Sequence, residues 1–204
     1  MTRTTLMCLA VLLAACGRDR ATASFPAADA STPGNPQHVD SVVPRDVAIE
    51  RFRQGTQPVS GFTGGASSRD ALVKAWVKAI ETADTAALTQ MLISRDEFAW
   101  VYYPTASQGL PPYDLSPSLL WFMVDGQTSK GLRRLLEERA GKPMHVIGYA
   151  CDPEPTTEGE NHLWGPCELK QVRAAGDTIR ERLFGLIVER GGQWKFLSYK
   201  GRYD

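Results

Sequence analysis

The chain of 204 residues carries 23 basic and 23 acidic side chains, so its formal net charge at pH 7 is zero. It has no basic stripe that would favour nucleic acid as a partner, and no polybasic patch that would favour an electrostatic membrane contact. Its hydrophobic content of 43%, with five tryptophans, is enough for one globular core.

The first sixteen residues have the layout of an export signal. Arg3 gives a short basic start, residues 6–15 are apolar and uncharged, and small residues precede Cys16. An apolar run of this length forms about 15 Å of helix, roughly half of a hydrocarbon core. A permanent transmembrane helix is therefore not expected here.

The tetrad Leu13-Ala14-Ala15-Cys16 resembles the lipobox of bacterial lipoproteins. The resemblance implies that residues 1–15 are removed and that Cys16 is acylated, palmitate included, and becomes the N-terminus. It also implies a periplasm-facing protein of the bacterial envelope, held by its lipid chains in the bilayer. Gly17, in place of an aspartate, implies the outer membrane. The alternative is an ordinary secretory signal that happens to precede a cysteine.

Residues 16–67 are expected to form a flexible tether after the lipid site, because Ala, Ser, Pro and Gly dominate without an apolar period. A short helix is expected at 44–54, where Pro44 suits an early helical position and Gly55 can end the helix. This helix either docks on the folded domain or merely interrupts the tether.

The folded domain is expected at 68–204, and its first half reads as mainly helical. Helical spacing of apolar residues follows a Ser68 cap, and a second short helix follows Asp84 or Thr85. The run EFAWVYYP is aromatic and β-branched, which predicts a strand ending at Pro104. After a loop, Ser116 and Pro117 predict the start of a helix over SLLWFMV, and a further helix is expected over SKGLRRLLEERAG.

The second half is expected to be β-structure. Four strands are predicted, separated by short connections, at 143–151, 163–174, 177–190 and 193–201. Gly191-Gly192 predicts a tight hairpin between the last two. Short connections favour an antiparallel meander, so the fold class is α+β, with N-terminal helices packed on a curved antiparallel sheet.

This element order, together with the closing GGQWKFLSY, resembles the nuclear-transport-factor-2-like cone fold, which ketosteroid isomerases and polyketide cyclases share. The resemblance covers about 68–203. The loop at 104–115 and the helix before Gly141 depart from it. It implies a cavity that can hold an acid or base, and a sheet face that can mediate homodimerisation.

Cys8 leaves with the signal, which leaves Cys151 and Cys167 beside the lipid site Cys16. An even pair in an oxidising compartment favours a disulfide. Zinc ligation with His145 and His162 is the first alternative, but the paired spacing of zinc sites is absent. A catalytic thiol is the second, and it would leave one cysteine unexplained.

Candidate catalytic residues are Glu181 as a general base, His145 as an acid or base and Tyr199 as a donor to an oxyanion. A structural role is favoured for each residue. Glu181 is expected near a strand start, within reach of water or of a cross-strand lysine, His145 is expected to be a satisfied polar residue, and Tyr199 is expected in the core. Asp96 and Glu97 are adjacent and would point to opposite faces of a strand, which argues against a paired-carboxylate site. No phosphate loop, zinc-protease or dinucleotide motif occurs, so no metal or cofactor is expected.

A binding rim is a further hypothesis. Trp100 and Tyr102 share one side of the predicted strand, and Glu160, His162 and Trp164 lie in the loop between the two cysteines.

The favoured functional hypothesis is a non-enzymatic lipoprotein that binds a small apolar ligand or an envelope protein. The alternatives are a cavity enzyme, such as an isomerase, dehydratase or hydrolase acting on an apolar substrate, and a structural dimerisation module.

Overall fold

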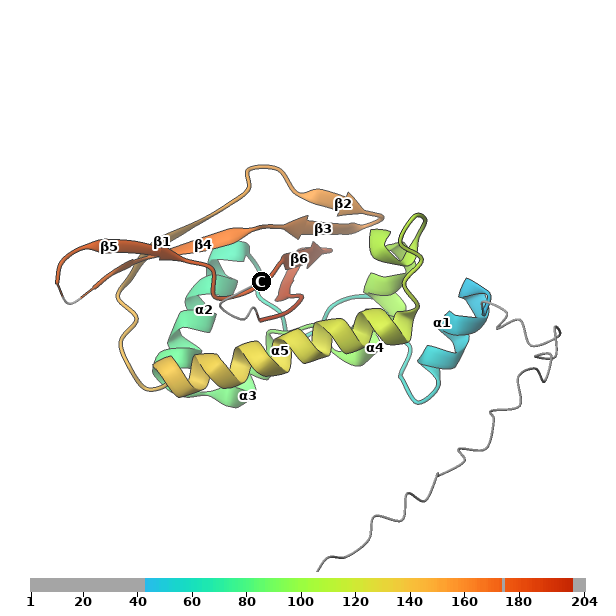
Figure 1. The fold of residues 1–204 in the computed structure, drawn as a ribbon, viewed down its shortest axis with the longest axis horizontal. Helices are drawn as coiled ribbons and strands as arrows, with labels where there is room; N and C mark the ends of the chain where they lie inside the picture. The colour runs from blue at the N-terminus through green and yellow to red at the C-terminus, as the bar shows by residue number, and fades with distance from the viewer. Residues whose placement is uncertain (1–42, 174, 200–204) are drawn as a thin grey trace, which may run out of the picture. The chain divides into compact units, whose positions relative to one another are not determined.

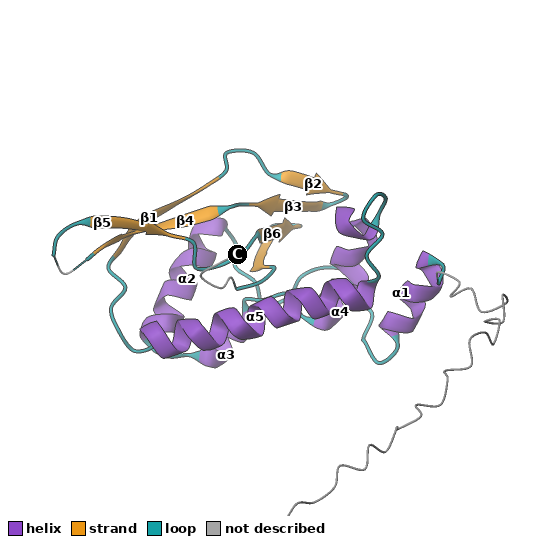
Figure 2. Cartoon of the chain, viewed as in Figure 1, coloured by secondary structure: helices purple, strands orange, loops and turns teal. Residues whose placement is uncertain are grey.

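The computed structural model describes residues 43–173 and 175–199, which combine helices with antiparallel sheets in an α+β fold (Figures 1 and 2). The described residues belong to one compact unit. The expected signal segment 1–15, the lipid site Cys16 and the first part of the expected tether lie outside the described residues.

The first helix, α1 (Arg45–Arg53), occupies the segment where a short helix is expected. It buries Phe52, which is 5% exposed, and Phe62 in the following segment is equally buried in the same apolar cluster. Residues 43–67 therefore belong to the folded unit and not to a tether, and the unit begins well before Ser68.

The next two helices begin at the caps that the sequence predicts. Ser68 Oγ accepts a hydrogen bond from the Ala71 N–H at the start of α2 (Arg69–Glu81). Asp84 Oδ1 does the same for the Ala87 N–H at the start of α3 (Thr85–Gln90). The buried face of α2 has the expected helical spacing and consists of Leu72, Val73, Trp76, Ala79 and Ile80.

The run EFAWVYYP is helical, so the strand expected there is wrong. A short helix, α4 (Arg95–Glu97), continues as a π-helical turn, η1 (Phe98–Tyr102), and then as two 3₁₀ turns, η2 (Tyr103–Thr105) and η3 (Ser107–Gly109). A capping box at Ser94 starts this run as a helix. The aromatic side chains then supply apolar packing, which overrides their β-propensity.

One long helix, α5 (Pro117–Arg139), replaces the two helices expected over the same stretch. It starts as predicted, because Ser116 Oγ accepts a hydrogen bond from the Leu119 N–H. Pro117 lies in the first turn of the helix, as expected. Gly126 and Gly131 do not interrupt it, because the helix packs on both core clusters through Leu120, Val124 and Leu135. In Figure 1, α5 runs along the side of the molecule opposite β1–β5.

The described strands form two antiparallel sheets, and not the single curved sheet expected. The first has the order β1-β4-β5 and the second β2-β3-β6-β7. The bounds are β1 (Val146–Cys151), β2 (Thr156–Glu158), β3 (Asn161–Trp164), β4 (Cys167–Val172), β5 (Thr178–Glu181), β6 (Ile187–Arg190) and β7 (Gln193–Phe196).

Two of the predicted strands are each divided between the sheets. Gly165-Pro166 separates β3 from β4, and residues 182–186 separate β5 from β6. Proline cannot donate to a sheet ladder, which explains the first break. At the second, a Cβ on Gly185 would lie 2.5 Å from Ser198 Oγ, so the glycine permits a close backbone approach. The predicted hairpin at Gly191-Gly192 is confirmed, since it joins β6 to β7.

The last strand, β7, lies where the core and the candidate site meet. It pairs with β6, and isolated bridges place Ala66 beside Trp194 and Leu92 beside Phe196. The segments before α2 and after α3 therefore border β7, although both lie far from it in sequence.

Candidate functional site

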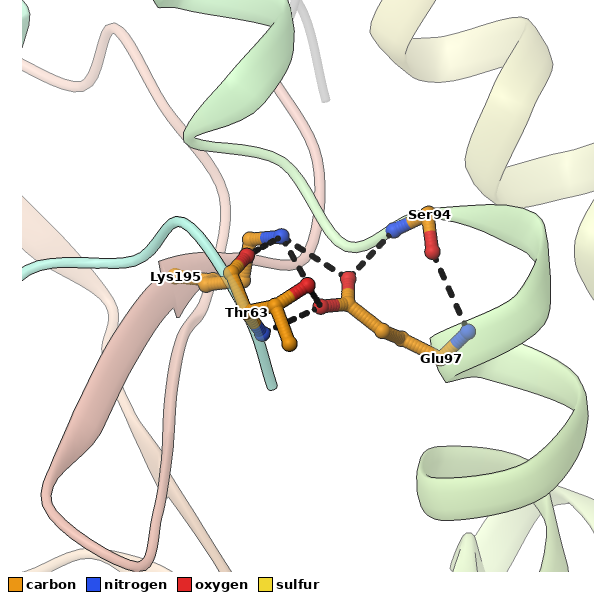
Figure 3. Close-up of polar contacts among 4 residues, drawn as sticks. All are labelled: Thr63, Ser94, Glu97 and Lys195. Atoms are coloured by element: carbon orange, nitrogen blue, oxygen red, sulfur yellow. Dashed lines mark hydrogen bonds and ion pairs between the residues drawn. The ribbon is translucent and has the colours of Figure 1, made fainter. Parts of the chain in front are cut away.

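A buried ion pair joins β7 to the end of α4. Lys195 Nζ lies 2.8 Å from Glu97 Oε2 and 3.0 Å from Oε1, and the Lys195 and Glu97 side chains are 4% and 2% exposed. Figure 3 shows the pair with Thr63 and Ser94, which complete the polar contacts. A buried charge is tolerated only where it is paired and hydrogen-bonded, and both conditions hold here.

The backbone around Glu97 holds its carboxylate in place. Glu97 Oε2 accepts from the Ser94 N–H at 2.7 Å, while Ser94 Oγ accepts from the Glu97 N–H at 3.1 Å, which is a reciprocal capping box. Glu97 Oε1 accepts from the Thr63 N–H at 2.7 Å. Lys195 Nζ also donates to the Thr63 carbonyl at 2.8 Å. The ion pair therefore fastens residue 63 to both α4 and β7.

A pocket of about 750 Å³ opens beside this ion pair. Its walls come from α5, from the segment between α3 and α4 and from β7. The apolar lining consists of Leu92, Ile93, Trp121, Val124, Leu132 and Leu197. The polar lining, besides the ion pair, consists of Thr63, Thr89, Gln90, Ser94, Asp125, Thr128 and Ser129. This volume lies within the range of small-molecule sites.

The ion pair is suited to structure rather than to proton transfer. Lys195 Nζ has contacts for its three donors, two with Glu97 oxygens and one with the Thr63 carbonyl. Both carboxylate oxygens of Glu97 accept backbone N–H groups as well. A general base or a nucleophile needs a free lone pair directed at the substrate, and this arrangement offers none.

The structure separates the three expected catalytic side chains. Tyr199 is fully buried, its O–H donates to the Leu88 carbonyl at 2.6 Å, and burial raises its pKa above the ordinary range. Glu181 lies 2.7 Å from the guanidinium of Arg139. His145 is exposed just before β1, with φ at +49°. The three side chains thus have different surroundings and do not form one site.

The five residues expected at a binding rim also have separate structural contacts. Tyr102 is buried, and Trp100 donates to Thr56 Oγ1 at 2.9 Å. Glu160 forms an ion pair with Arg190, and His162 Nδ1 lies 3.2 Å from Thr157 Oγ1. The guanidinium carbon of Arg69 lies over the Trp164 ring, 4.5 Å from the centroid of the ring.

The predicted disulfide is present. Cys151 and Cys167 are bonded, and they face each other in the register of β1 and β4. The bond closes the loop that contains β2 and β3. At the tip of that hairpin, Glu158 Oε1 accepts from the Ser107 N–H at 3.0 Å, and Asn161 Nδ2 donates to the Val101 carbonyl at 3.1 Å. The stapled loop thus holds the helical run at 101–107.

Within residues 43–173 and 175–199, no three His, Cys, Asp or Glu side chains gather closely enough to hold a metal ion. None of the helices described is long and apolar enough to cross a membrane. Comparisons with known protein families, with curated proteins and with solved structures find no match to this chain.

Sequence reasoning missed Glu97 and Lys195. The first of two usable signals in the sequence is the S-x-x-E spacing of Ser94 and Glu97 ahead of an apolar run, which is typical of a helix start. A second signal is Lys195 within the apolar final strand, because a charged residue buried there needs a partner of opposite charge.

Proposed function

We propose that this chain is a bacterial envelope lipoprotein whose folded domain is a non-catalytic binding module, with its ligand in the pocket beside Glu97 and Lys195. The acylated Cys16 would hold it in the outer membrane with the domain facing the periplasm. The observation that supports binding best is the pocket of about 750 Å³, in whose lining the buried charges of Glu97 and Lys195 neutralise each other.

The lining favours a small, mainly apolar ligand with a neutral or cationic polar group, because the Asp125 carboxylate also lines the pocket. Trp121, Leu132 and Leu197 offer apolar contact, whereas the hydroxyls of Thr128 and Ser129 can bond to a polar end. Lys195 and Glu97 present no net charge, so an ionised ligand would find no free counter-charge in the ion pair.

The cavity-enzyme hypothesis receives less support. Tyr199, Glu181 and His145 lie in different surroundings, and Tyr199 and Glu181 already have partners. Catalysis by these groups would require them to meet at one reacting atom, within hydrogen-bond reach.

The cone-like arrangement remains part of the proposal. The helices α1 to α5 ahead of antiparallel strands, and the closing Gly191-Gly192 hairpin, support it. An experimental structure would test whether the two sheets together form one curved wall around the pocket.

Titration with the uncharged apolar dye 1-N-phenylnaphthylamine tests the pocket. We expect saturable binding to the wild-type chain, and Ser129→Trp should weaken it at least about tenfold because the indole fills the pocket, a loss of roughly 1.4 kcal/mol in binding free energy. Lys130→Trp is the matched control, since Lys130 is the next residue of α5 and lies outside the pocket lining. Absence of saturable binding, or equal loss in both variants, would contradict the proposal.

Metabolic labelling with palmitate tests the anchor. We expect label on the wild-type chain and none on Cys16→Ala, with the wild type in the membrane fraction. An unlabelled, soluble wild type would show that the lipobox resemblance is misleading.

A further inference from the structure

Large exposed apolar side chains gather at one end of the domain. Among the described residues, seven such side chains are exposed, and six of them lie either at Val43 or between Leu110 and Met123. The most exposed are Phe122 at 74% and Tyr113 at 65%, and the others in this stretch are Leu110, Leu119 and Met123. Contiguous exposed apolar groups mark interaction surfaces.

Three of these side chains share the outer face of α5. Leu119, Phe122 and Met123 follow i, i+3, i+4 spacing, so they lie together on the exposed side of the helix, and Met123 also borders a smaller pocket with the buried Leu120 and Val124. Further along, the same face carries Lys130, Arg133 and Glu137. The face is therefore apolar only at the N-terminal end of the helix.

The chain enters the folded domain at this same end. Arg45, in the first turn of α1, donates through Nε to the Gly109 carbonyl and through Nη2 to the Pro104 carbonyl, each at 2.9 Å. Val43 is thus held close to the loop that carries Leu110 and Tyr113. Figure 1 shows α1 beside the N-terminal end of α5.

We propose that this apolar end, formed by Leu110, Tyr113, Leu119, Phe122 and Met123, docks on the bilayer that holds the acylated N-terminus. The inference rests on the proposed lipid anchor at Cys16. Only residues 17–42 separate that anchor from Val43, and a chain of that length spans at most about 90 Å even when fully extended.

Such a short link favours docking even by a weakly binding surface. Attachment through a short link raises the effective concentration of the second contact, to about the millimolar range for short linkers. Loop 107–116 and the first turns of α5, up to Met123, contain Asp114 but no Lys or Arg. The contact is therefore apolar, and it should not require anionic lipid or low salt.

Depth-dependent fluorescence quenching tests the docking independently of acylation. A full chain with Cys16→Ser and an N-terminal His tag is bound to phosphatidylcholine vesicles that contain a nickel-chelating lipid and brominated acyl chains. We expect Phe122→Trp to show additional quenching relative to the wild type, and Lys130→Trp to show none. Equal quenching in the two variants would overturn the proposal.

A second measurement uses the untagged Cys16→Ser chain and plain phosphatidylcholine vesicles. Leu119→Ser/Phe122→Ser should lower the partition coefficient by at least about tenfold, since two large side chains lose their apolar burial. Both residues are exposed, so the fold should survive, and circular dichroism checks this. Lys130→Ser should leave partitioning unchanged.

Three outcomes separate this proposal from its rivals. If sedimentation shows a dimer of the Cys16→Ser chain that Phe122→Ser dissociates, and no vesicle binding, the face joins two copies and the bilayer proposal is wrong. If palmitate labels Cys16 but the Phe122→Trp variant shows no additional quenching, docking fails while the anchor stands. Additional quenching without palmitate labelling would support the membrane-binding face and refute the anchor.

Discussion

Lys195 and Glu97, which are 98 residues apart in the sequence, form an ion pair in which every donor and acceptor has a partner. The pair joins the final strand to the capping box that starts the helical run 95–109. It also forms one side of the candidate pocket. Loss of either charge should therefore affect both stability and ligand binding.

Replacing Glu97 with Gln should lower the free energy of unfolding by about 3–5 kcal/mol, because a buried ammonium group would lose its counter-charge. The amide would also place N–H donors against the Ser94 or Thr63 N–H groups. Urea denaturation followed by tryptophan fluorescence measures the loss.

Lys195→Met is the informative comparison. It leaves the Glu97 carboxylate with two backbone N–H donors, so it should destabilise the protein less than Glu97→Gln. The double variant should be more stable than the sum of the two losses predicts, which a double-mutant cycle reveals. Additive losses would mean that the pair contributes no coupling.

The contact between Gly159 and Thr105 predicts a local steric effect. Gly159 has φ at +64°, and a Cβ there would lie 2.6 Å from Thr105 Cγ2. Thr105 Oγ1 accepts from Asn161 Nδ2 at 3.0 Å, which limits its rotation. Gly159→Ala should therefore lower the free energy of unfolding by about 1–3 kcal/mol beyond the loss that an alanine in this left-handed backbone conformation causes by itself.

Gly191→Ala provides the control for that effect. Its φ is +57°, and nothing lies within 4 Å of the added Cβ, so it measures only the cost of a left-handed alanine. Thermal or urea unfolding of both variants gives the difference. Equal losses would show that the β2–β3 turn does not pack tightly on Thr105.

Local signals explain what could be predicted from the sequence. Ser68, Asp84 and Ser116 each cap a helix as expected, and Gly191-Gly192 turns a hairpin, because these features depend on a few neighbouring residues. The Cys151–Cys167 bond was predicted from the even number of remaining cysteines and from the expected oxidising compartment.

Non-local packing explains what the sequence did not reveal. The aromatic run at 98–103 has strand-forming composition, but burial among Phe52, Leu120 and Val188 stabilises it as a helix. The β-structure divides into two sheets because strands pair with partners that are distant in sequence. The ion pair of Glu97 with Lys195 depends on distant segments in the same way. The pocket arises from the same long-range contacts.

Buried tyrosines predict a loss of stability at alkaline pH. Burial raises the pKa of Tyr102 and of Tyr199, with the nearby Glu158 carboxylate adding to the effect on Tyr102. The unfolded chain ionises its tyrosines near pH 10, whereas the folded protein keeps these two neutral. Stability is thus fully present below about pH 10 and falls as the pH rises toward the folded-state pKa values.

A titration to alkaline pH in which tyrosinate absorbance and tryptophan fluorescence are followed together checks this loss of stability. Ionisation of the two buried groups should coincide with unfolding. Tyr199→Phe should make the fall in unfolding free energy above about pH 10 shallower by about 1.4 kcal/mol per pH unit, because one proton fewer is released. An unchanged slope would show that Tyr199 ionises in the folded state.

Loss of the disulfide should lower both the stability of the whole domain and the local stability of the loop that the bond closes. Cys151→Ala/Cys167→Ala should lower the free energy of unfolding by about 3 kcal/mol in the chain-entropy model for a loop of this size. Because the loop carries β2 and β3, whose tip binds residues 101–107, amide hydrogen exchange should rise first in these segments. The β6–β7 hairpin lies outside the loop and serves as the internal control. Equal acceleration in both regions would mean that the bond stabilises only the global fold and does not specifically hold the β2–β3 tip against the helical run.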